Sequence, residues 1–137
     1  MERRAENSPV NTLFPGDIEV TWARLLSIMD EAAATMIRTA YSITIRESKD
    51  LAVVLFDRQG RALAESAIAS PSFLGTLPRT LEAFVSTYPI SEWQSDDLVI
   101  TNDPWIGSGH LQDITMASPI YLVDDLLGFV AISAHGP

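Results

Sequence analysis

The sequence predicts an α+β fold of mostly antiparallel hairpins with two main helices. Apolar residues recur at three- and four-residue steps over 17–40 and again over 76–88, the spacing of helices with one buried face. Short apolar runs bounded by turn residues fill much of the remaining chain, which is typical of antiparallel strands. Hydrophobic residues make up 47% of the 137 residues, enough for one core but not for two.

The first helix is expected over 17–40, after an arm formed by residues 1–16 that ends in a turn at Pro15-Gly16. Asp17 is the predicted cap of this helix, and Arg38 near its end favours the helix dipole. The apolar face is interpreted as core and consists of Ile18, Trp22, Leu25, Leu26, Met29, Ala33, Met36, Ile37 and Ala40. The arm and one domain, residues 17–137, are the predicted organisation.

Four strands are predicted after this helix, three of them before the second helix and one after it. Residues 41–46 alternate at period two and are rich in β-branched side chains, so they predict a strand. Residues 51–56 form a nearly continuous apolar run, and 61–65 return as its partner after a turn at 57–60 with Gly60. A further strand is expected over 98–101.

The second helix is predicted to begin with Thr76 as its cap, with Pro78 in its first turn, and to end near Tyr88 before Pro89. Its expected core face holds Leu77, Leu81, Phe84 and Val85. A final strand pair is predicted at about 114–122 and 126–134, folded over Asp124-Asp125.

Composition excludes several classes of protein. The formal charge of −9 argues against nucleic acid and anionic membranes as partners, because few cations are present to neutralise phosphates. The chain contains no cysteine, which excludes disulfides, thiolate catalysis and cysteine-ligated metals. Neither a secretory signal nor a membrane-length apolar run is visible, so a soluble cytoplasmic protein is expected.

The two histidines mark the place where chemistry is expected. His110 and Asp113 lie three residues apart at the end of a polar, glycine-containing loop, and His135 closes the last strand. A turn centred on Asp124-Asp125 pairs Ile114 with His135, whereas a one-residue change pairs Asp113 with His135. Either register brings both histidines and Asp113 into one neighbourhood.

Imidazole and carboxylate ligands suit a divalent metal such as Zn²⁺, Mn²⁺ or Fe²⁺. His110, Asp113 and His135, with Asp103 as a further candidate, make a plausible ligand set. The alternative is an aspartate–histidine hydrogen bond that only orders the loop. A phosphate cradle at Gly107-Ser108-Gly109 is disfavoured, because no lysine and no strong helix follow.

Two further residues are candidates for substrate binding. Arg46 begins the charged segment 46–50, which can hold an anionic substrate or can simply be a charged turn. Trp105 lies inside the polar loop, where it can line a pocket.

Several motifs together resemble the hydantoinase B/5-oxoprolinase family over about 17–137. They are Arg38-Thr39-Ala40-Tyr41-Ser42, the segment 46–50, Phe56-Asp57 with Gln59-Gly60, the stretch 71–77, Asn102-Asp103-Pro104, the run 107–115 and the apolar strand pair that ends at Ala134-His135. The resemblance implies part of a subunit of an ATP-dependent enzyme that opens cyclic amides such as hydantoins or 5-oxoproline.

The resemblance also implies cofactors and partners. A divalent metal would be held by His110, Asp113 and His135, while Asp103 matches the Asn-Asp-Pro motif. A hydantoinase A-type subunit would handle ATP, within a hetero-oligomer. A related alternative is the metal-binding subunit of acetone- or acetophenone-type carboxylases, which act on ketones.

Two departures qualify the resemblance. Family members are several times longer, and many carry a second histidine where this chain has Gly136. The chain is therefore expected to be a truncated or split subunit that is inactive alone and exposes apolar surface. The alternative from another class is a non-enzymatic α+β sensor or interaction module. The hairpin over 56–65 resembles the hairpins of small ligand-sensing domains.

Overall fold

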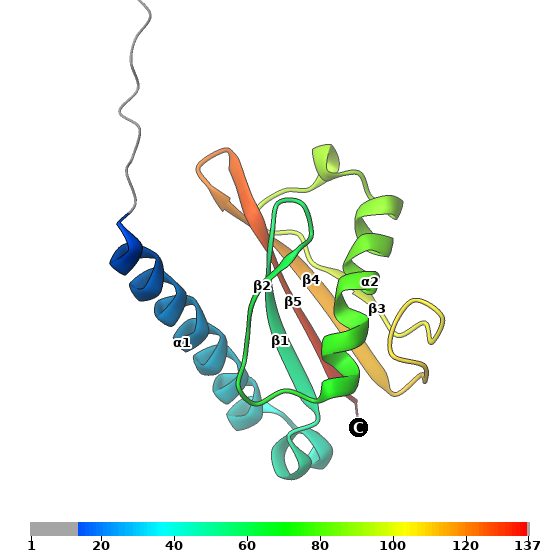
Figure 1. Cartoon of the computed structure of the whole chain (residues 1–137). Helices are drawn as coiled ribbons and strands as arrows, with labels where there is room; N and C mark the ends of the chain where they lie inside the picture. The colour runs from blue at the N-terminus through cyan, green and yellow to red at the C-terminus, as the bar shows by residue number, and fades with distance from the viewer. Residues whose placement is uncertain (1–13, 137) are drawn as a thin grey trace, which may run out of the picture.

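The computed structural model describes residues 14–136 and confirms the α+β class. In chain order the elements are α1 (Pro15–Thr39), the π-helical turn η1 (Thr44–Ser48), β1 (Leu51–Asp57), β2 (Ala62–Glu65), α2 (Pro71–Thr87), the 3₁₀ turn η2 (Ile90–Glu92), β3 (Val99–Thr101), β4 (Asp113–Leu122) and β5 (Asp125–His135). The strands form one five-stranded sheet in the order β2-β1-β5-β4-β3, antiparallel throughout (Figure 1).

The two long helices pack on opposite faces of this sheet. Alternate residues of β1 point to opposite sides, so Val54 and Phe56 join the core under α2 while Val53 and Leu55 join the core under α1. In Figure 1, α2 crosses in front of the strands, and α1 lies at the left, separated from α2 by β1 and β2. Burial on both faces explains why β1 reads as a continuous apolar run.

The first helix begins earlier than predicted. Pro15 lies in its first turn, where a backbone N–H has no partner within the helix and its absence in proline costs nothing. The turn predicted at Pro15-Gly16 is therefore wrong. Asp17 is not the cap: its carboxylate accepts the N–H of Phe14 at 3.1 Å from within the first turn. The earlier part of the predicted arm, residues 1–13, lies outside the described residues.

The strand predicted over 41–46 is wrong, because this segment turns helically into η1. The carbonyl oxygen of Ser42 accepts the N–H of Arg46 at 3.2 Å, and Ile45 is buried in the core beside α1. Lys49 then takes a left-handed conformation with φ 55° and redirects the chain into β1. Ser42 and Ile45, three residues apart, are the buried residues of this segment, a spacing that fits a helical turn and not one face of a strand.

The second helix also begins before its predicted cap. Pro71 lies at its start and the carbonyl oxygen of Ser70 accepts the N–H of Phe73 at 3.0 Å, so Thr76 lies inside the helix. A proline at 71 satisfies the same N-terminal preference that was assigned to Pro78, which is instead an interior residue. The predicted core residues Leu77, Leu81 and Phe84 are buried, and Val85 is partly buried against them.

The β4–β5 hairpin contains an irregularity that decides its register. Leu122 pairs with Asp125, so the turn lies at Val123-Asp124 and not at the predicted Asp124-Asp125. Tyr121 pairs with Leu126 but Ile120 pairs with Gly128, which leaves Leu127 as the extra residue of a β-bulge. Without that bulge the same turn would pair Asp113 with Ala134.

The β1–β2 hairpin forms as predicted, with Gly60 at φ 76°. The carboxylate of Asp57 organises the turn by accepting the backbone N–H groups of Gln59 and Arg61, both at 2.9 Å, and Nε of Arg61 at 2.7 Å. Burial raises the pKa of the Asp57 carboxyl, but these hydrogen bonds and the charge of Arg61 outweigh it and hold the pKa below its ordinary value of 3.8.

This lowered pKa makes the hairpin acid-sensitive. Stabilisation by ionised Asp57 is present above pH 3.8 and is lost as the pH falls through the lower pKa of the folded state. We expect Asp57→Asn to lower the urea midpoint at neutral pH and to reduce its further loss at about pH 3. Asp125→Asn, which removes an exposed carboxylate 3.7 Å from Arg58, is the control and should change neither. Equal acid sensitivity of Asp57→Asn and the unsubstituted protein would contradict this role.

Within residues 14–136, no helix is both long enough and apolar enough to cross a membrane.

Candidate metal centre

The structure brings His110, Asp113 and His135 together at one end of the sheet. Nε2 of His110 lies 3.0 Å from Oδ2 of Asp113, and Nδ1 of His135 lies 3.0 Å from Oδ1. The two imidazole rings are 5.2 Å apart between centroids and tilted by 50°. One ligand atom from each of the three residues lies within 4.8 Å of the others. The predicted cluster therefore has the geometry of one site.

The strand register places these residues. Asp113 begins β4 and His135 ends β5, and the two are directly paired, so their side chains emerge on the same face. This face also carries α2, because the next pair along the strands, Thr115 and Ser133, leads toward the core beneath that helix. The hydroxyl groups of Thr115 and Ser133 lie 2.9 Å apart and satisfy each other, both buried.

The end of β5 is fixed by backbone contacts on both sides of His135. The N–H of His135 donates to the carbonyl oxygen of Asp50 at 3.1 Å, and the N–H of Gly136 donates to that of Gln112 at 2.7 Å. A Cβ atom on residue 136 would lie 2.8 Å from this same carbonyl oxygen of Gln112. A glycine is therefore needed where the strand end approaches the backbone of the loop.

The carboxylate of Asp113 is the buried centre of the cluster. Its side chain is 3% exposed, whereas those of His110 and His135 are 49% and 26% exposed. A carboxylate only accepts hydrogen bonds, so Nδ1 of His135 donates to Oδ1 of Asp113 in this arrangement. A second donor is the hydroxyl of Ser108, directed at Oδ2. An exposed and a partly exposed histidine thus flank a buried, hydrogen-bonded acid.

These three residues fit a divalent metal. Ligands bound at about 2.0–2.1 Å lie roughly 3.0–3.4 Å from their neighbours around the ion. The nitrogen–oxygen separations of 3.0 Å are at the lower end of that range, and the three ligand atoms, which lie within 4.8 Å of one another, would move closer together around an ion. Imidazole and carboxylate are the ligand types that zinc, manganese and iron accept. The same contacts also satisfy the alternative of an aspartate–histidine network that orders the loop.

The other predicted site residues lie outside this three-residue group. Oδ1 of Asp103 accepts the backbone N–H of Trp105 at 2.9 Å, so this carboxylate shapes the loop. Trp105 is 89% exposed, and its ring is not part of the core. Arg46 is an exposed residue of η1, the turn that packs against β5.

Sequence reasoning missed Ser108 and the role of α2 in holding the loop. Thr80 of α2 donates to the carbonyl oxygen of Ile106 at 2.8 Å, and Arg79 donates to that of Gly107 at 3.2 Å. Ser108 follows at once and reaches Asp113. No spacing links residues 79–80 to the loop in sequence, although a serine between two glycines five residues before Asp113 was a visible signal.

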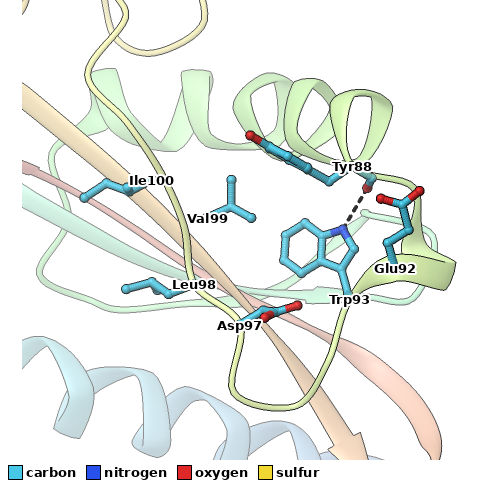
Figure 2. Close-up of a pocket in the computed structure, with 7 residues that line it drawn as sticks. All are labelled: Tyr88, Glu92, Trp93, Asp97, Leu98, Val99 and Ile100. Carbon is cyan, nitrogen blue, oxygen red and sulfur yellow. Dashed lines mark hydrogen bonds between the residues drawn. The ribbon is translucent and has the colours of Figure 1, made fainter.

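A separate hollow of about 370 Å³ lies between the end of α2 and the edge strand β3 (Figure 2). The indole of Trp93 forms one wall and donates through Nε1 to the carbonyl oxygen of Tyr88 at 2.7 Å. The remaining lining residues are Glu92, Asp97, Leu98, Val99 and Ile100. None of the three clustered residues lines this hollow, so it is not part of the candidate metal centre.

A comparison with known protein families gives a match over nearly the whole chain. The hydantoinase B/oxoprolinase family model matches residues 15–137, which include the whole cluster. The chain belongs to the hydantoinase B/oxoprolinase family. This membership confirms the resemblance carried by the sequence motifs.

Relatives of this hydantoinase B/oxoprolinase chain are much longer. A 5-oxoprolinase of Dictyostelium discoideum is 32% identical over 123 residues, which make up 90% of this chain and 10% of that protein. The putative B subunit of a D-/L-hydantoinase of Pseudomonas sp. is 29% identical over 134 residues, 94% of this chain and 22% of that protein. The chain thus spans between about a tenth and a fifth of the length of these relatives.

Solved structures share the fold of this hydantoinase B/oxoprolinase chain. A nucleotide-free acetone carboxylase matches with a TM-score of 0.75 and 23% identity, over 85% of this chain and 16% of that one. An ATP-dependent caprolactamase from Pseudomonas jessenii matches with a TM-score of 0.58 and 20% identity, over 92% of this chain and 21% of that one. Both similarities concern the fold.

Proposed function

We propose that this chain is part of a B-type subunit that acts in the ATP-dependent hydrolytic opening of a cyclic amide such as a hydantoin or 5-oxoproline. The observation that carries the proposal is the cluster of His110, Asp113 and His135 within a chain of the hydantoinase B/oxoprolinase family. Family membership also favours this function over a sensor or interaction module. Relatives whose names refer to 5-oxoproline, hydantoin and caprolactam support a cyclic amide as the substrate class.

The three clustered side chains would hold a divalent zinc, manganese or iron ion. Such an ion supplies Lewis-acid polarisation of a carbonyl oxygen. The two histidines are the exposed side of the cluster, so a substrate oxygen can approach there while Asp113 stays buried. Catalytic sites differ from structural ones in leaving such an open position. Three protein ligands, with one imidazole exposed and the other partly exposed, match the catalytic type.

Substrate contacts are proposed for Arg46 and Trp105. Arg46 is exposed on η1, beside the end of β5 that carries His135, and its guanidinium can pair with a carboxylate. Trp105 is exposed on the loop that carries His110. Asp103 supports that loop through the N–H of Trp105, and we propose no metal contact for it.

ATP handling is assigned to a hydantoinase A-type partner in a cytoplasmic hetero-oligomer. Support comes from the Pseudomonas relative, which is itself described as one subunit of a hydantoinase. The fold match to acetone carboxylase keeps a ketone-carboxylating subunit as the second candidate function. In both reactions the group to be polarised is a carbonyl oxygen, so the same cluster serves either substrate.

The proposal is tested by co-expressing the chain with an A-type subunit and the remaining part of a B-type subunit, and assaying ATP-dependent release of the ring-opened acid from 5-oxoproline and hydantoin. Activity should disappear after chelation, return with a divalent metal and be at least roughly 100-fold lower in His110→Ala. Acetone-dependent bicarbonate consumption without amide hydrolysis would select the carboxylase function instead. Amide hydrolysis that is unaffected by chelation and by His110→Ala would contradict the proposal.

A further inference from the structure

Within the described residues, Ser108 is the one donor to Asp113 that does not depend on an imidazole proton. The carboxylate receives hydrogen bonds from Ser108 and His135, and Nε2 of His110 lies 3.0 Å from its Oδ2 atom. An imidazole nitrogen that coordinates a metal gives it a lone pair and carries no proton, so it no longer donates to Asp113. A hydroxyl is unaffected by this exchange. The Ser108 contact is therefore compatible with both the metal-free and the metal-bound cluster.

The segment that carries Ser108 is held rigidly by α2. Two consecutive carbonyl oxygens, of Ile106 and Gly107, accept the side chains of Thr80 and Arg79 at 2.8 and 3.2 Å. The hydroxyl of Thr80 is buried, and it also lies 3.1 Å from the carbonyl oxygen of Thr76 in its own helix. Its shorter contact is the one to the loop.

The loop backbone is also closed on itself at this point. The N–H groups of Ile106 and Gly107 both donate to the carbonyl oxygen of Asp103, at 3.2 and 2.8 Å. A Cβ atom on Gly107 would lie 3.3 Å from that oxygen, so the turn is tight. Ser108 thus directly follows a backbone segment that is held by hydrogen bonds from α2 and by the turn at Asp103.

We propose that Ser108 is a positioning residue that fixes the carboxylate of Asp113 for metal binding, and that Thr80 on α2 acts through the loop to place Ser108. The inference rests on the proposed metal site and deepens it. A buried carboxylate with a single fixed donor keeps one orientation while its other contacts change between histidines and metal. Partners of this kind orient ligands, and their loss typically weakens metal binding about 10–100-fold.

The test compares Co²⁺ titrations of Ser108→Ala, Ser108→Thr, Thr80→Val and Thr80→Ser by calorimetry and visible absorption. We expect Ser108→Ala to bind Co²⁺ about 10–100-fold more weakly with an altered absorption spectrum. Ser108→Thr keeps the hydroxyl and should restore most of the affinity. Thr80→Val should weaken binding by about tenfold, and Thr80→Ser should restore it. Thr87→Val is the matched control, because Thr87 donates only to the carbonyl oxygen of Ala83 near the other end of α2.

A second measurement separates this inference from the metal site itself. In the metal-free protein, the imidazole ¹⁵N signals of His110 and His135 report their contacts with Asp113. We expect Ser108→Ala to shift or broaden both signals, and Ser108→Thr to retain them. If the unsubstituted protein binds no Co²⁺, the metal function fails, and these signals alone decide the positioning role. Unchanged signals, or unchanged Co²⁺ affinity in a protein that binds it, would overturn the role of Ser108.

Discussion

Replacing His135 with alanine is expected to reduce divalent-metal affinity by more than about 100-fold, beyond the loss caused by removing an outer partner of a ligand. His135 would supply one of three protein ligands, and its ring contacts Asp113 at 3.0 Å. His110→Ala should have an effect of the same size, because Nε2 of His110 faces the other oxygen of Asp113. Calorimetric titration with Zn²⁺ or Mn²⁺ measures both losses.

The metal-free stability of these variants separates a metal centre from a purely structural network. Loss of a hydrogen bond to the buried Asp113 carboxylate costs about 1.5–3 kcal/mol, so His135→Ala should unfold at lower urea without metal. Added metal should stabilise the unsubstituted protein further and leave the variant unchanged. Thermal midpoints that do not respond to metal in either protein would favour the network that only orders the loop.

Gly128→Ala is expected to destabilise the protein by at least about 3 kcal/mol, in the upper range for overpacking. A Cβ atom at this position would overlap the carbonyl oxygen of Phe56 and approach Cα of Asp57 to 3.3 Å. These are backbone atoms of the neighbouring strand β1, so relief requires β1 and β5 to separate. Urea unfolding followed by far-ultraviolet circular dichroism measures the effect.

Gly75→Ala is the matched control for this substitution. Gly75 lies inside α2, and a Cβ atom there would meet no atom within 4 Å. Alanine should therefore stabilise the helix by about 0.5–1 kcal/mol, because glycine loses more backbone freedom on folding. Equal stability changes in Gly75→Ala and Gly128→Ala would show that the close approach of β1 to Gly128 is not present.

The sequence pattern predicted the elements for which it fits only one kind of secondary structure. The run over 51–56 and the turn with Gly60 predicted the β1–β2 hairpin, because a continuous apolar strand followed by a glycine turn has few alternatives. The apolar stripe of α1 was found, although Ile18 and Trp22 in its first half are about half exposed. A stripe therefore fixes which side of a helix faces the core but not how far along the helix the core extends.

Errors occurred where local chemistry supported two structures. Alternation over 41–46 fits a strand, yet this segment turns helically and buries Ile45. Two prolines, Pro71 and Pro78, can each begin a helix, and the first does. The register of β4 and β5 depends on a bulge at Leu127, which no turn residue marks. Tertiary packing decides these cases.

The three clustered residues of the candidate site were predicted from the sequence, but the residues that support them were not. His110, Asp113 and His135 were identified from their types and from the return of the last strand, and the structure brings all three together. The support by Ser108 and Thr80 could not be inferred, because the contact between α2 and the loop joins residues 26 apart in sequence. Such contacts follow from the fold and leave no periodic trace.

The most direct test of the metal centre is a crystal structure of the protein grown with Mn²⁺ or Zn²⁺, with anomalous difference density collected at the edge of the metal. We predict one strong peak bound by His110, the carboxylate of Asp113 and His135, and no peak there in Asp113→Asn, whose side chain has nearly the same shape. Density that shows both histidines still in contact with Asp113, with no peak among the three residues, would contradict the metal centre.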